Sequence, residues 1–552
     1  MDQVDVVVVG AGTGMLAAIT AAEEGLRVLV VEKAAYVGGS TSLSGGGFWV
    51  PGNSILAENG QRDDPERVRT YLRAVTKGEV PDERWRSHVE HGPAAVEVLR
   101  RRTPLRFQFM AEYADYFPEL PGGSATGRAC EPRPFDLKRL GPDRDLLLPP
   151  TMAAPFPMPI TGRGYKWTNL VARSPKGFVT SALAVAQGVG GAAIRREYAA
   201  GGQALAAGLL AGLRSMNVPV WTSSPLTDLV VEDGRVVGVV VNHDGKDTTV
   251  RARAGVVLAS GGFDRDAAMR RTYQSESIDG RWSLGAAADT GEVIQIAASH
   301  GAELAFMDAA WWFPVIPLPD GTTGPMLAER SLPGQIIVNG HGRRFMDEAV
   351  NYMTAGQLII AKHTADDPHI PAWIVFDQRY RNRYLFGGAL FPRQPLPPSW
   401  YDAGIAKKGA TIAALADALG MPDLPTTVDR FNLLAAAGRD DDFGRGDSAY
   451  DRYYGDPRVS PNPCLGPIDS GPFYAVQVVP GDLGTCGGVR ADAYARVLRP
   501  DGSVIPGLYA TGNAAGNAFG RVYPGPGATV GQGLSFGYVA ARHLAGRFGG
   551  ME

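Results

Sequence analysis

The hydrophobic pattern at the start of the chain predicts a strand, a glycine turn, a helix and a second strand. Residues 4–9 form a short apolar run, interrupted only by Asp5, that suits a buried strand, and the stretch GAGTG follows directly at 10–14. Apolar positions on one face then predict a helix over 15–24, and another apolar run predicts a strand over 27–31. The acidic residue Glu32 ends this unit.

This order of elements is typical of a βαβ unit that binds a dinucleotide. Gly10 allows the tight turn, and Gly12 lets the backbone approach a pyrophosphate at the positive end of the helix. Glu32 would accept hydrogen bonds from an adenosine ribose. The unit therefore predicts a bound dinucleotide.

Two features of this unit leave alternatives open. Met15 stands where the GxGxxG pattern expects its third glycine, and Gly14 comes one place early, so an ordinary turn with chance glycines is the competing interpretation. Residues 4–22 are also apolar enough to resemble a membrane span. The three glycines and the acidic pair at 23–24 argue against a span.

A second glycine-rich stretch follows at residues 36–52. It contains GGST at 38–41 and SGGG at 44–47, a composition that does not suit a core. Glycine permits close approach of a ligand to the backbone, and serine and threonine offer donors. We therefore expect this stretch to run past the pyrophosphate, ribityl chain and ring of a flavin. The alternative is a flexible loop without a ligand.

Downstream, the pattern predicts surface helices and further strands. The stretch 103–170 is long for a loop and rich in proline and aromatic residues; loops of this length are usually functional or disordered, and the aromatic content favours function. The predicted helices span 65–76, 82–102, 201–216 and 534–547, and the predicted strands span 218–221, 226–232, 235–242, 248–253 and the start of 255–263. The last of these helices would present its positive N-terminus to an anionic group.

These elements predict an α/β fold in three segments. A strand followed by a glycine turn recurs at 255–263 and at 507–513, so the chain returns twice to the nucleotide-binding sheet. In the region between them the sequence changes in character at about residue 306, where repeated prolines and short predicted helices begin and indicate an inserted domain. The predicted boundaries are 1–305, 306–480 and 481–552.

Composition narrows the class of protein. A net charge of -3 over 552 residues gives no sign of a nucleic-acid partner. The three cysteines are too few and too scattered for a disulfide framework, and the eight histidines form no HxxxH or HxH cluster, so we expect no metal. The start of the chain lacks the pattern of a signal peptide, which predicts a cytoplasmic protein.

Several motifs together resemble the flavoprotein superfamily of fumarate reductases and 3-ketosteroid dehydrogenases. Three further stretches look like the 3-ketosteroid 1-dehydrogenase family in particular. The superfamily motifs are GAGTGM at 10–15, Glu32-Lys33, GGST and SGGG, VVLASGGF at 256–263, and GLYATGN at 507–513. The family stretches are DYFPELPGG at 115–123, CLGPIDSGPFYAV at 464–476 with PGDLGTCGGV at 480–489, and RVYPGPGATVGQGLSFGYVAA at 521–541.

The resemblance implies a fold, a cofactor and a reaction. It implies a Rossmann-like FAD-binding domain split in sequence around an inserted α+β catalytic domain that caps it. The FAD is expected to be bound without a covalent link. The expected reaction removes two hydrogens across the C1–C2 bond of a 3-ketosteroid. No second nucleotide fingerprint follows a strand, so a quinone or another carrier is a more plausible electron acceptor than NAD(P). Loose association with a membrane stays open, with no transmembrane segment expected.

By the same resemblance, four residues carry the chemistry. The hydroxyl of Tyr523 and the backbone N–H of Gly527 hold the keto oxygen, and Tyr352 takes the proton from C2 while a hydride leaves C1. Tyr116 is the partner of Tyr352, with Tyr113 as an alternative for that position. A tyrosine has a pKa near 10, so its anion must be stabilised or its proton relayed. The alternative for each tyrosine is that it only packs in the core and takes no part in the reaction.

The motifs and the resemblance also give a set of cofactor-binding residues. These are Gly10, Gly12, Thr13, Gly14, Glu32, Lys33, Gly39, Ser40, Thr41, Ser44, Gly45, Gly46, Gly47, Ser260, Gly261, Asp289, Gly512, Asn513, Thr529 and Val530.

Three rival functions remain at this point. A fumarate reductase-like enzyme would need several cationic residues around a dicarboxylate, whereas the aromatic, proline-rich stretch 103–135 and YPGPG suit an apolar ketone better. A 4-(5α) dehydrogenase of 3-ketosteroids would act on the other side of the ketone, and YPGPG argues against it. A non-catalytic flavin or sterol carrier would not need the tyrosines. Departures at Met15, Ser42-Leu43 and Gln532-Gly533 affect the steroid preference more than the reaction.

Overall fold

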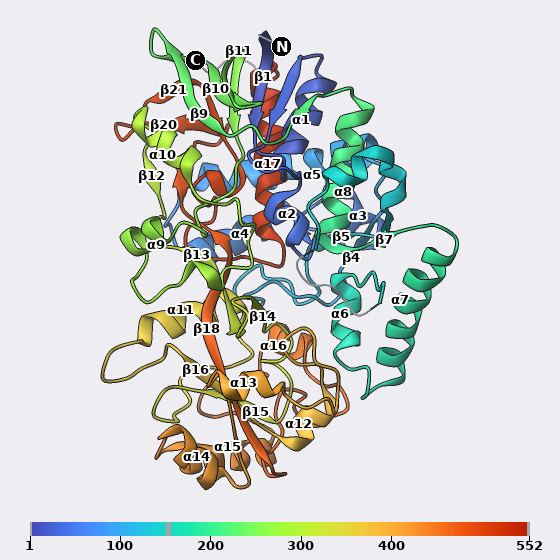
Figure 1. Cartoon of the computed structure of the whole chain (residues 1–552), viewed down its shortest axis with the longest axis vertical. Helices are drawn as coiled ribbons and strands as arrows, with labels where there is room; N and C mark the ends of the chain where they lie inside the picture. Colours follow the sequence, from blue (N-terminus) through green and yellow to red (C-terminus); the bar gives the residue numbers. More distant parts are fainter. Residues whose placement is uncertain (1–2, 151–155, 549–552) are drawn as a thin grey trace.

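The computed structural model describes residues 3–150 and 156–548. It is elongated, with one sheet toward each end of its long axis (Figure 1). The first sheet has eight strands and the second has six. The α/β class that the sequence predicts is confirmed.

The eight-stranded sheet has a parallel centre in the order β21-β11-β1-β2-β8, with β20 antiparallel at one edge and a β9–β10 hairpin extending from β11. Parallel strands are usually covered on both faces. Here Val6 and Val8 face α1 and α17, while Val7 and Val9 face α10 and the hairpin. The strands are β1 (Gln3–Val9), β2 (Val28–Val31), β8 (Val220–Trp221), β9 (Leu226–Glu232), β10 (Arg235–His243), β11 (Lys246–Leu258), β20 (Arg496–Leu498) and β21 (Val504–Ala510).

Helices α1 and α17 lie side by side against this sheet (Figure 1). The structure corrects the predicted start of the closing helix, which begins at Ala528 rather than at residue 534. Glycines are poor helix formers, but here they are needed, because a Cβ at Gly531 would lie 2.3 Å from the carbonyl oxygen of Trp49. The helices around the sheet are α1 (Gly14–Glu23), α5 (Asp82–Arg102), α8 (Gly201–Ser215), α10 (Glu292–Ser299) and α17 (Ala528–Leu544). Helix α4 (Pro65–Thr76) packs on α5 and belongs to the apolar cluster that includes β13 and β18.

The six-stranded sheet is antiparallel and is built around β18, which runs through its middle for 13 residues. Helix α11 (Tyr352–Lys362) packs on β13, while α14 (Ile412–Leu419) and α15 (Leu424–Ala437) belong to a separate apolar cluster with β15 and β16. The strands are β13 (Ala310–Pro317), β14 (Thr323–Pro325), β15 (Gln335–Val338), β16 (Ala372–Asp377), β17 (Ala406–Gly409) and β18 (Phe473–Thr485).

The two sheets take their strands from different segments of the chain. Every strand of the six-stranded sheet comes from residues 310–485, and the eight-stranded sheet uses residues before 259 and after 495. The boundary predicted after residue 480 falls inside β18.

The segment predicted as a long aromatic loop contains short elements. Strands β4 (Phe107–Phe109) and β5 (Ala129–Pro132) form a small sheet with β3 (Phe48–Trp49), and α6 (Gly162–Thr168) follows. The next helix, α7 (Pro175–Ala193), has no counterpart among the predicted elements. Across the described ranges, no helix combines the length and the apolar character needed to cross a membrane.

Candidate active site

The first glycine turn is fixed by its contact with the end of β11. Gly10 has a φ of +108°, and a Cβ there would lie 2.3 Å from the carbonyl oxygen of Ala259. A Cβ at Gly14 would lie 2.6 Å from the Cβ of Ala259. Gly14 therefore supplies the close helix–strand packing that the third glycine of the pattern normally supplies. Met15, at the position of the missing glycine, is fully buried in the core.

The N-termini of α1 and α17 are suited to anionic groups. In the described part of the chain, no side chain caps α1 at Thr13 or α17 at Gly527. Helix N-termini carry partial positive charge and donors that need partners. The start of α1 lies against the second turn of α17, because a Cβ at Gly533 would lie 2.5 Å from the hydroxyl oxygen of Thr13. Both features fit a dinucleotide cofactor.

Acidic groups lie at the edge of this region. Glu32 accepts hydrogen bonds from the backbone N–H groups of Ala11 (2.8 Å) and Ala34 (2.9 Å), which orient its carboxylate at the end of β2. Lys33 is held in an ion pair with Glu292, at 2.9 Å.

A second acidic contact involves Asp289 and the glycine-rich stretch. The Ser40 hydroxyl donates to Asp289 at 2.6 Å. Burial raises the pKa of Asp289 well above its ordinary value, and the charge of Asp264 adds to this effect.

The second glycine-rich stretch packs closely against the start of α8 at one glycine and has free space beside two others. A Cβ at Gly46 would lie 2.2 Å from a backbone atom of Gly201, whereas among the described residues, apart from the chain neighbours, no atom lies within 4 Å of the Cβ position at Gly39 or Gly45. The Ser44 hydroxyl donates to the carbonyl of Thr41 at 2.7 Å. The open glycines fit a ligand that approaches the backbone.

The remaining predicted cofactor residues lie around the same helix ends. Asn513 accepts hydrogen bonds from the Trp311 indole (3.0 Å) and the Thr529 hydroxyl (3.2 Å), so it links β13 to α17. A Cβ at Gly512 would lie 3.4 Å from the Thr13 hydroxyl oxygen. The structure also brings together Gly12 with Thr41, Gly10 with Ser260, Gly261 with Asp289, and Gly47 with Gly527, and it buries Val530.

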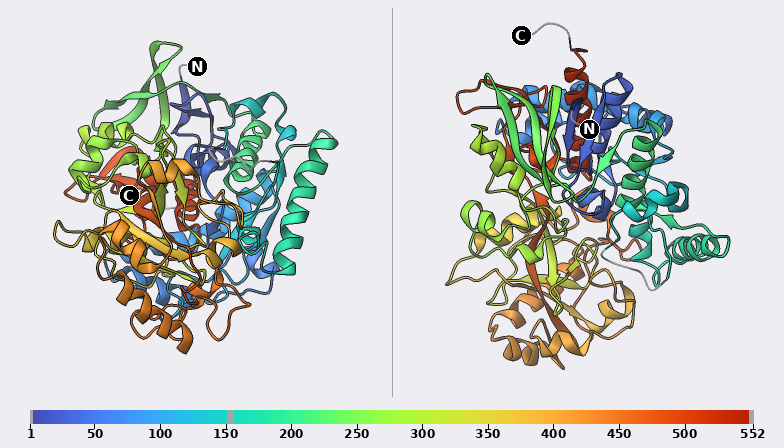
Figure 2. Two further views of the ribbon diagram at one scale, coloured as in Figure 1. Left: turned by 60° about the horizontal axis from the view of Figure 1, so that its bottom comes forward. Right: turned by 45° about the horizontal axis from the view of Figure 1, so that its top comes forward.

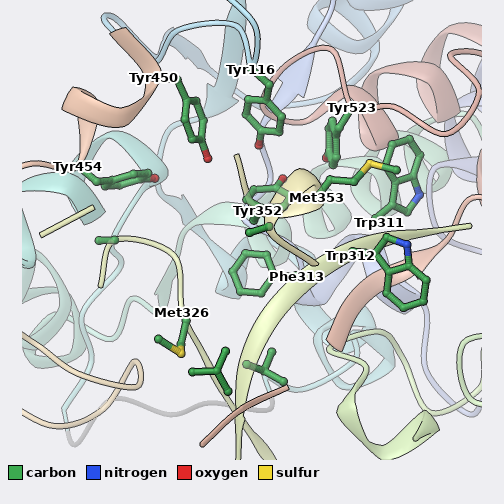
Figure 3. Packing of buried hydrophobic residues seen from close by; sticks show 14 of the residues in the cluster. Tyr116, Trp311, Trp312, Phe313, Met326, Tyr352, Met353, Tyr450, Tyr454 and Tyr523 are labelled. Atoms are coloured by element: carbon green, nitrogen blue, oxygen red, sulfur yellow. The ribbon is translucent and has the colours of Figure 1, made fainter. Parts of the chain in front are cut away.

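Three tyrosines that are distant in sequence converge beside the N-terminus of α17. The ring of Tyr352 lies 5.2 Å from that of Tyr116 and 5.5 Å from that of Tyr523, and Tyr116 and Tyr523 are 5.0 Å apart. Figure 3 shows the hydroxyls of Tyr116 and Tyr523 directed to the region of Tyr352. Tyr113 instead stacks on Tyr453 at 4.4 Å. The geometry thus groups Tyr116, rather than Tyr113, with Tyr352.

Local structure explains how these side chains are positioned. Tyr352 is the first residue of α11, whose N-terminus is capped by Asn351 through the N–H of Thr354 at 3.0 Å. The N–H of Tyr116 donates to the carbonyl of Pro524 at 3.1 Å, which ties the aromatic loop to the segment that enters α17. Gly527 adopts φ +87° at the start of α17.

Alternate residues of β13 form an aromatic wall. Trp311 lies 4.5 Å from Tyr523, and Phe313 lies 4.9 Å from Tyr352 (Figure 3). Side chains two apart on a strand point to the same face. Trp312 faces the other way, toward Arg270 and α11.

Burial keeps the three phenols protonated at neutral pH. It raises the pKa of Tyr352 and Tyr116 well above the ordinary value, and neighbouring tyrosines raise both further. Burial also raises the pKa of Tyr523 to about 12. All three are therefore donors in this state, and the hydroxyl of Tyr116 has no hydrogen-bond partner among the described residues.

Two features of the site were not identified from the sequence. Tyr450 lies 4.9 Å from Tyr116, and its buried hydroxyl also lacks a partner within residues 3–150 and 156–548. The cluster of three tyrosines between 450 and 454 was the available signal.

The second feature is a buried ion pair next to Tyr116. Asp115 contacts the Arg128 guanidinium and accepts from the Trp49 indole at 2.8 Å and the Ser124 N–H at 3.0 Å. The indole of Trp49 also packs on Gly525, where a Cβ would lie 2.4 Å away. The pair thus supports both Tyr116 and the segment that enters α17.

Replacing Arg128 with methionine is expected to lower the free energy of unfolding by about 3–5 kcal/mol, because it leaves a buried carboxylate without its cation. Arg128 and Asp115 are 1% and 0% exposed, and burial raises the pKa of Asp115 to about 6 even with Arg128 present. Urea unfolding measures the loss. The matched control is Arg86→Met, which removes an exposed pair with Asp82 and should cost about 1 kcal/mol or less. Equal losses in the two variants would contradict the prediction.

Known proteins match this chain over nearly its whole length. The FAD binding domain family matches residues 5–530. The chain is 45% identical to the 3-oxosteroid 1-dehydrogenase of Mycolicibacterium smegmatis, over 98% of this chain and 97% of that protein. It is 44% identical to the 3-oxosteroid 1-dehydrogenase of Mycobacterium tuberculosis strain H37Rv, over 100% and 99%.

A solved structure matches the fold equally well. The crystal structure of 3-ketosteroid Δ1-dehydrogenase from Sterolibacterium denitrificans, in complex with 1,4-androstadiene-3,17-dione, has a TM-score of 0.93. It is 36% identical to this chain, over 99% of this chain and 100% of that one. Sequence and fold therefore point to the same relatives.

Proposed function

The chain belongs to the 3-oxosteroid 1-dehydrogenase family of FAD-binding proteins, and we propose that it removes two hydrogens from 3-ketosteroids across the C1–C2 bond. The observation that carries this proposal is the convergence of Tyr116, Tyr352 and Tyr523 beside the N-terminus of α17. The aromatic wall of Trp311 and Phe313 supports an apolar ring system as the substrate.

The first task of the site is to stabilise charge on the keto oxygen. Proton removal from C2 places negative charge on that oxygen, so donors aimed at it favour the transition state. The Tyr523 hydroxyl is protonated, because burial raises its pKa to about 12, and it can donate. The N–H of Gly527 lies at the positive end of α17 and is the second proposed donor. Loss of one such donor typically costs roughly 3–4 kcal/mol of transition-state stabilisation.

The second task is to accept the proton from C2. We assign it to Tyr352, with Tyr116 as the partner that hydrogen-bonds to its oxygen and stabilises the phenolate. The 5.2 Å spacing of the two rings and the unpartnered hydroxyl of Tyr116 support this assignment. Because burial holds the pKa of Tyr352 well above the ordinary value, its phenol must first release its own proton to the solvent before it can accept one from C2.

FAD, when bound, supplies the acceptor for the hydride that leaves C1. The uncapped ends of α1 and α17 and the open glycines at 39 and 45 would hold it, with Glu32 at the ribose. We propose that it is bound without a covalent link and is reoxidised by a quinone or another carrier. We also propose that 306–480 form the catalytic domain inserted between two parts of the FAD domain, 1–305 and 481–552.

The rate should rise with pH. Because the pKa of Tyr352 is raised, its protonated form dominates at neutral pH and the basic form grows as pH increases. We expect log kcat to climb with a slope near +1 through the alkaline range, in a series measured between about pH 6 and about pH 10. A rate that stays constant over this interval would argue against a tyrosine base.

Product analysis tests the proposed reaction directly. The purified holoenzyme is mixed without oxygen with androst-4-ene-3,17-dione and, in a separate sample, with a 5α-reduced 3-ketosteroid, and bleaching of the flavin and the position of the new double bond are measured. We expect bleaching and a C1–C2 double bond. Desaturation of a 5α-steroid at C4–C5 instead would indicate the 4-(5α) reaction. Absence of bleaching by any 3-ketosteroid, with fumarate oxidising the reduced flavin, would indicate a fumarate reductase.

A further inference from the structure

A buried serine bridges two aspartates where the two sheets approach each other. Strand β18 runs from the six-stranded sheet toward the eight-stranded one (Figures 1 and 2), and Asp482 lies near its C-terminal end. The Oγ atom of Ser283 lies 2.7 Å from Oδ1 of Asp482. It also lies 2.8 Å from Oδ2 of Asp264, which follows the glycine turn after β11. All three side chains are buried, so these contacts are shielded from solvent.

The serine oxygen can make these contacts only if one of the two carboxyl groups is protonated. A serine hydroxyl has one proton and two lone pairs, so it donates to one carboxyl group at a time. The N–H of Gly285 donates to the Oγ atom of Ser283 at 2.9 Å and uses one lone pair. The second carboxyl group therefore completes the arrangement as an acid whose O–H donates to the remaining lone pair.

The neighbouring groups decide which aspartate is the acid. Asp482 accepts hydrogen bonds from the Arg270 guanidinium at 2.6 Å and from the N–H of Gly484 at 2.9 Å, and both donors favour a carboxylate. Arg270, on α9 (Ala267–Tyr273), is 0% exposed and requires that negative partner. The Oδ1 atom of Asp264 has no hydrogen-bond partner within residues 3–150 and 156–548. Asp482 is thus the carboxylate and Asp264 the neutral acid.

The charges around Asp264 agree with this assignment. Burial raises the pKa of Asp264 to about 7, and the negative charge of Asp482 adds to the effect. Asp289, on the other side, also has a pKa well above its ordinary value, because of burial and the charge of Asp264. The other charged groups that act on these two acids are Arg270, Glu32 and Lys33. Asp264 therefore gains or loses its proton near neutral pH.

Asp264 lies between two of the residues assigned to the cofactor. Asp289, which the Ser40 hydroxyl contacts, is close enough to interact with its charge. The unpartnered Oδ1 atom of Asp264 lies 3.8 Å from the Cβ position of Gly484, and that position lies 2.5 Å from the side-chain nitrogen of Asn513. A charge on Asp264 would therefore arise beside the proposed flavin site.

We propose that Asp264 controls the reduction potential of the bound flavin: as a neutral acid it permits reduction, and as a carboxylate it opposes reduction. The dehydrogenation brings a hydride from C1, and with it one negative charge, into the site. A buried carboxylate beside the site repels that charge, whereas a carboxylic acid does not. The control of the potential requires only bound FAD, and its connection with the steroid hydride rests on the proposed function.

The proposal implies uptake of a proton at alkaline pH. When Asp264 is ionised and the hydride arrives, its carboxylate takes one proton from the solvent and becomes the acid. The steroid supplies both electrons with the hydride, and the proton from C2 leaves separately to Tyr352. Reduction and protonation of Asp264 are therefore linked, and each favours the other.

A redox titration of the holoenzyme tests the proposal, with dithionite in place of the steroid as the reductant. The flavin potential is measured for the parent enzyme and for Asp264→Asn between about pH 5.5 and about pH 9, an interval that spans the raised pKa of Asp264. Asparagine stays neutral throughout, and its amide can still donate to Ser283. The two potentials should agree at the acid end, and the parent potential should be lower at the alkaline end.

The expected difference at the alkaline end is about tenfold in the equilibrium constant for reduction, or about 30 mV for a two-electron couple. Two unit charges about 10 Å apart interact this strongly at an effective dielectric constant of about 20. Infrared difference spectra of reduction at alkaline pH should show the carbonyl band of a new carboxylic acid in the parent and not in Asp264→Asn. An aspartate with a purely structural role would give both proteins the same dependence of potential on pH.

The matched control is Glu329→Gln. Glu329 is also 0% exposed, and burial raises its pKa to about 7. It lies beside Tyr380 in the region of the six-stranded sheet, because the Tyr380 hydroxyl donates to its backbone carbonyl at 3.0 Å. Loss of this second buried acid should leave the dependence of the flavin potential on pH unchanged.

Ser283→Ala provides a second test if Asp264→Asn does not retain its fold or its FAD. The hydrogen bond from Ser283 lowers the pKa of Asp264, so its loss should move the change in slope of potential against pH to a higher pH. An unshifted change in slope would overturn the proposal, and so would parallel curves for the parent and Asp264→Asn. An enzyme that gives the expected curves but oxidises no 3-ketosteroid would contradict the proposed function and not this inference.

Discussion

Replacing Tyr352 with phenylalanine is expected to lower kcat by about 10²–10⁴-fold, the usual contribution of a general base. The substitution removes one oxygen and keeps the ring that packs between Phe313 and Tyr116. FAD content and steroid affinity should therefore change little, so the loss should fall on kcat and not on KM. Stopped-flow reduction of the flavin by androst-4-ene-3,17-dione measures this step directly.

The control for this variant is Tyr380→Phe. Tyr380 is another buried tyrosine, and its hydroxyl donates to the carbonyl of Glu329 at 3.0 Å in the six-stranded sheet region. Its loss should cost about 1 kcal/mol of stability and leave the rate unchanged. A Tyr352→Phe enzyme that reduces its flavin within about tenfold of the parent rate would exclude Tyr352 as the base.

Local patterns predicted the elements whose periodicity is unambiguous. The helices over 65–76 and 82–102 agree with α4 and α5 at both ends, because each has a clear apolar face and begins beside a proline. The first βαβ unit is confirmed within one residue at β1 and α1. Family membership and the FAD-binding fold are confirmed by the relatives, whereas the three-segment division stays a prediction.

The missed elements are those in which tertiary contacts override local preference. β18 contains Pro480, Gly481 and Gly484, which normally interrupt a strand, but its backbone is paired with strands on both sides. α7 lacks an inward apolar stripe, so its pattern did not indicate a helix that packs on a core. In both cases the decisive contacts join residues that are distant in sequence.

The same limit applies to the site. Gly10, Gly12 and Glu32 could be found from the residues alone because they lie in one short unit. Tyr116, Tyr352 and Tyr523 come from three separate parts of the chain, and only the family resemblance could group them. The only local signal for Tyr450 was the cluster of tyrosines at 450–454, and the Asp115–Arg128 pair follows from the packing and has no local signature.

Gly527→Ala is expected to lower kcat about a hundredfold, through a displacement of the N-terminus of α17. Gly527 has a φ of +87°, and an added Cβ would lie 2.3 Å from the carbonyl oxygen of Gly47. The N–H of Trp49 donates to the carbonyl of Gly527 at 3.1 Å and so joins the segment at 47–49 to the start of α17. Neither segment can therefore move without the other. A shift of about 1 Å in a positioning group can cost about 10²-fold in rate.

A control substitution at another glycine with positive φ distinguishes this prediction from a general loss of stability. Gly502→Ala places the same methyl group at a comparable φ of +82°, but in the part of the chain that the structure describes no atom beyond the adjacent residues lies within 4 Å of it. It carries only the conformational cost, about 1–2 kcal/mol, and should keep full activity. Because the keto oxygen and the flavin both depend on the start of α17, Gly527→Ala should lose FAD affinity and kcat together. Fluorescence titration of FAD and single-turnover kinetics measure the two effects. An alanine variant with normal flavin affinity and a normal rate would show that the start of α17 accommodates the added methyl group, which would contradict this prediction.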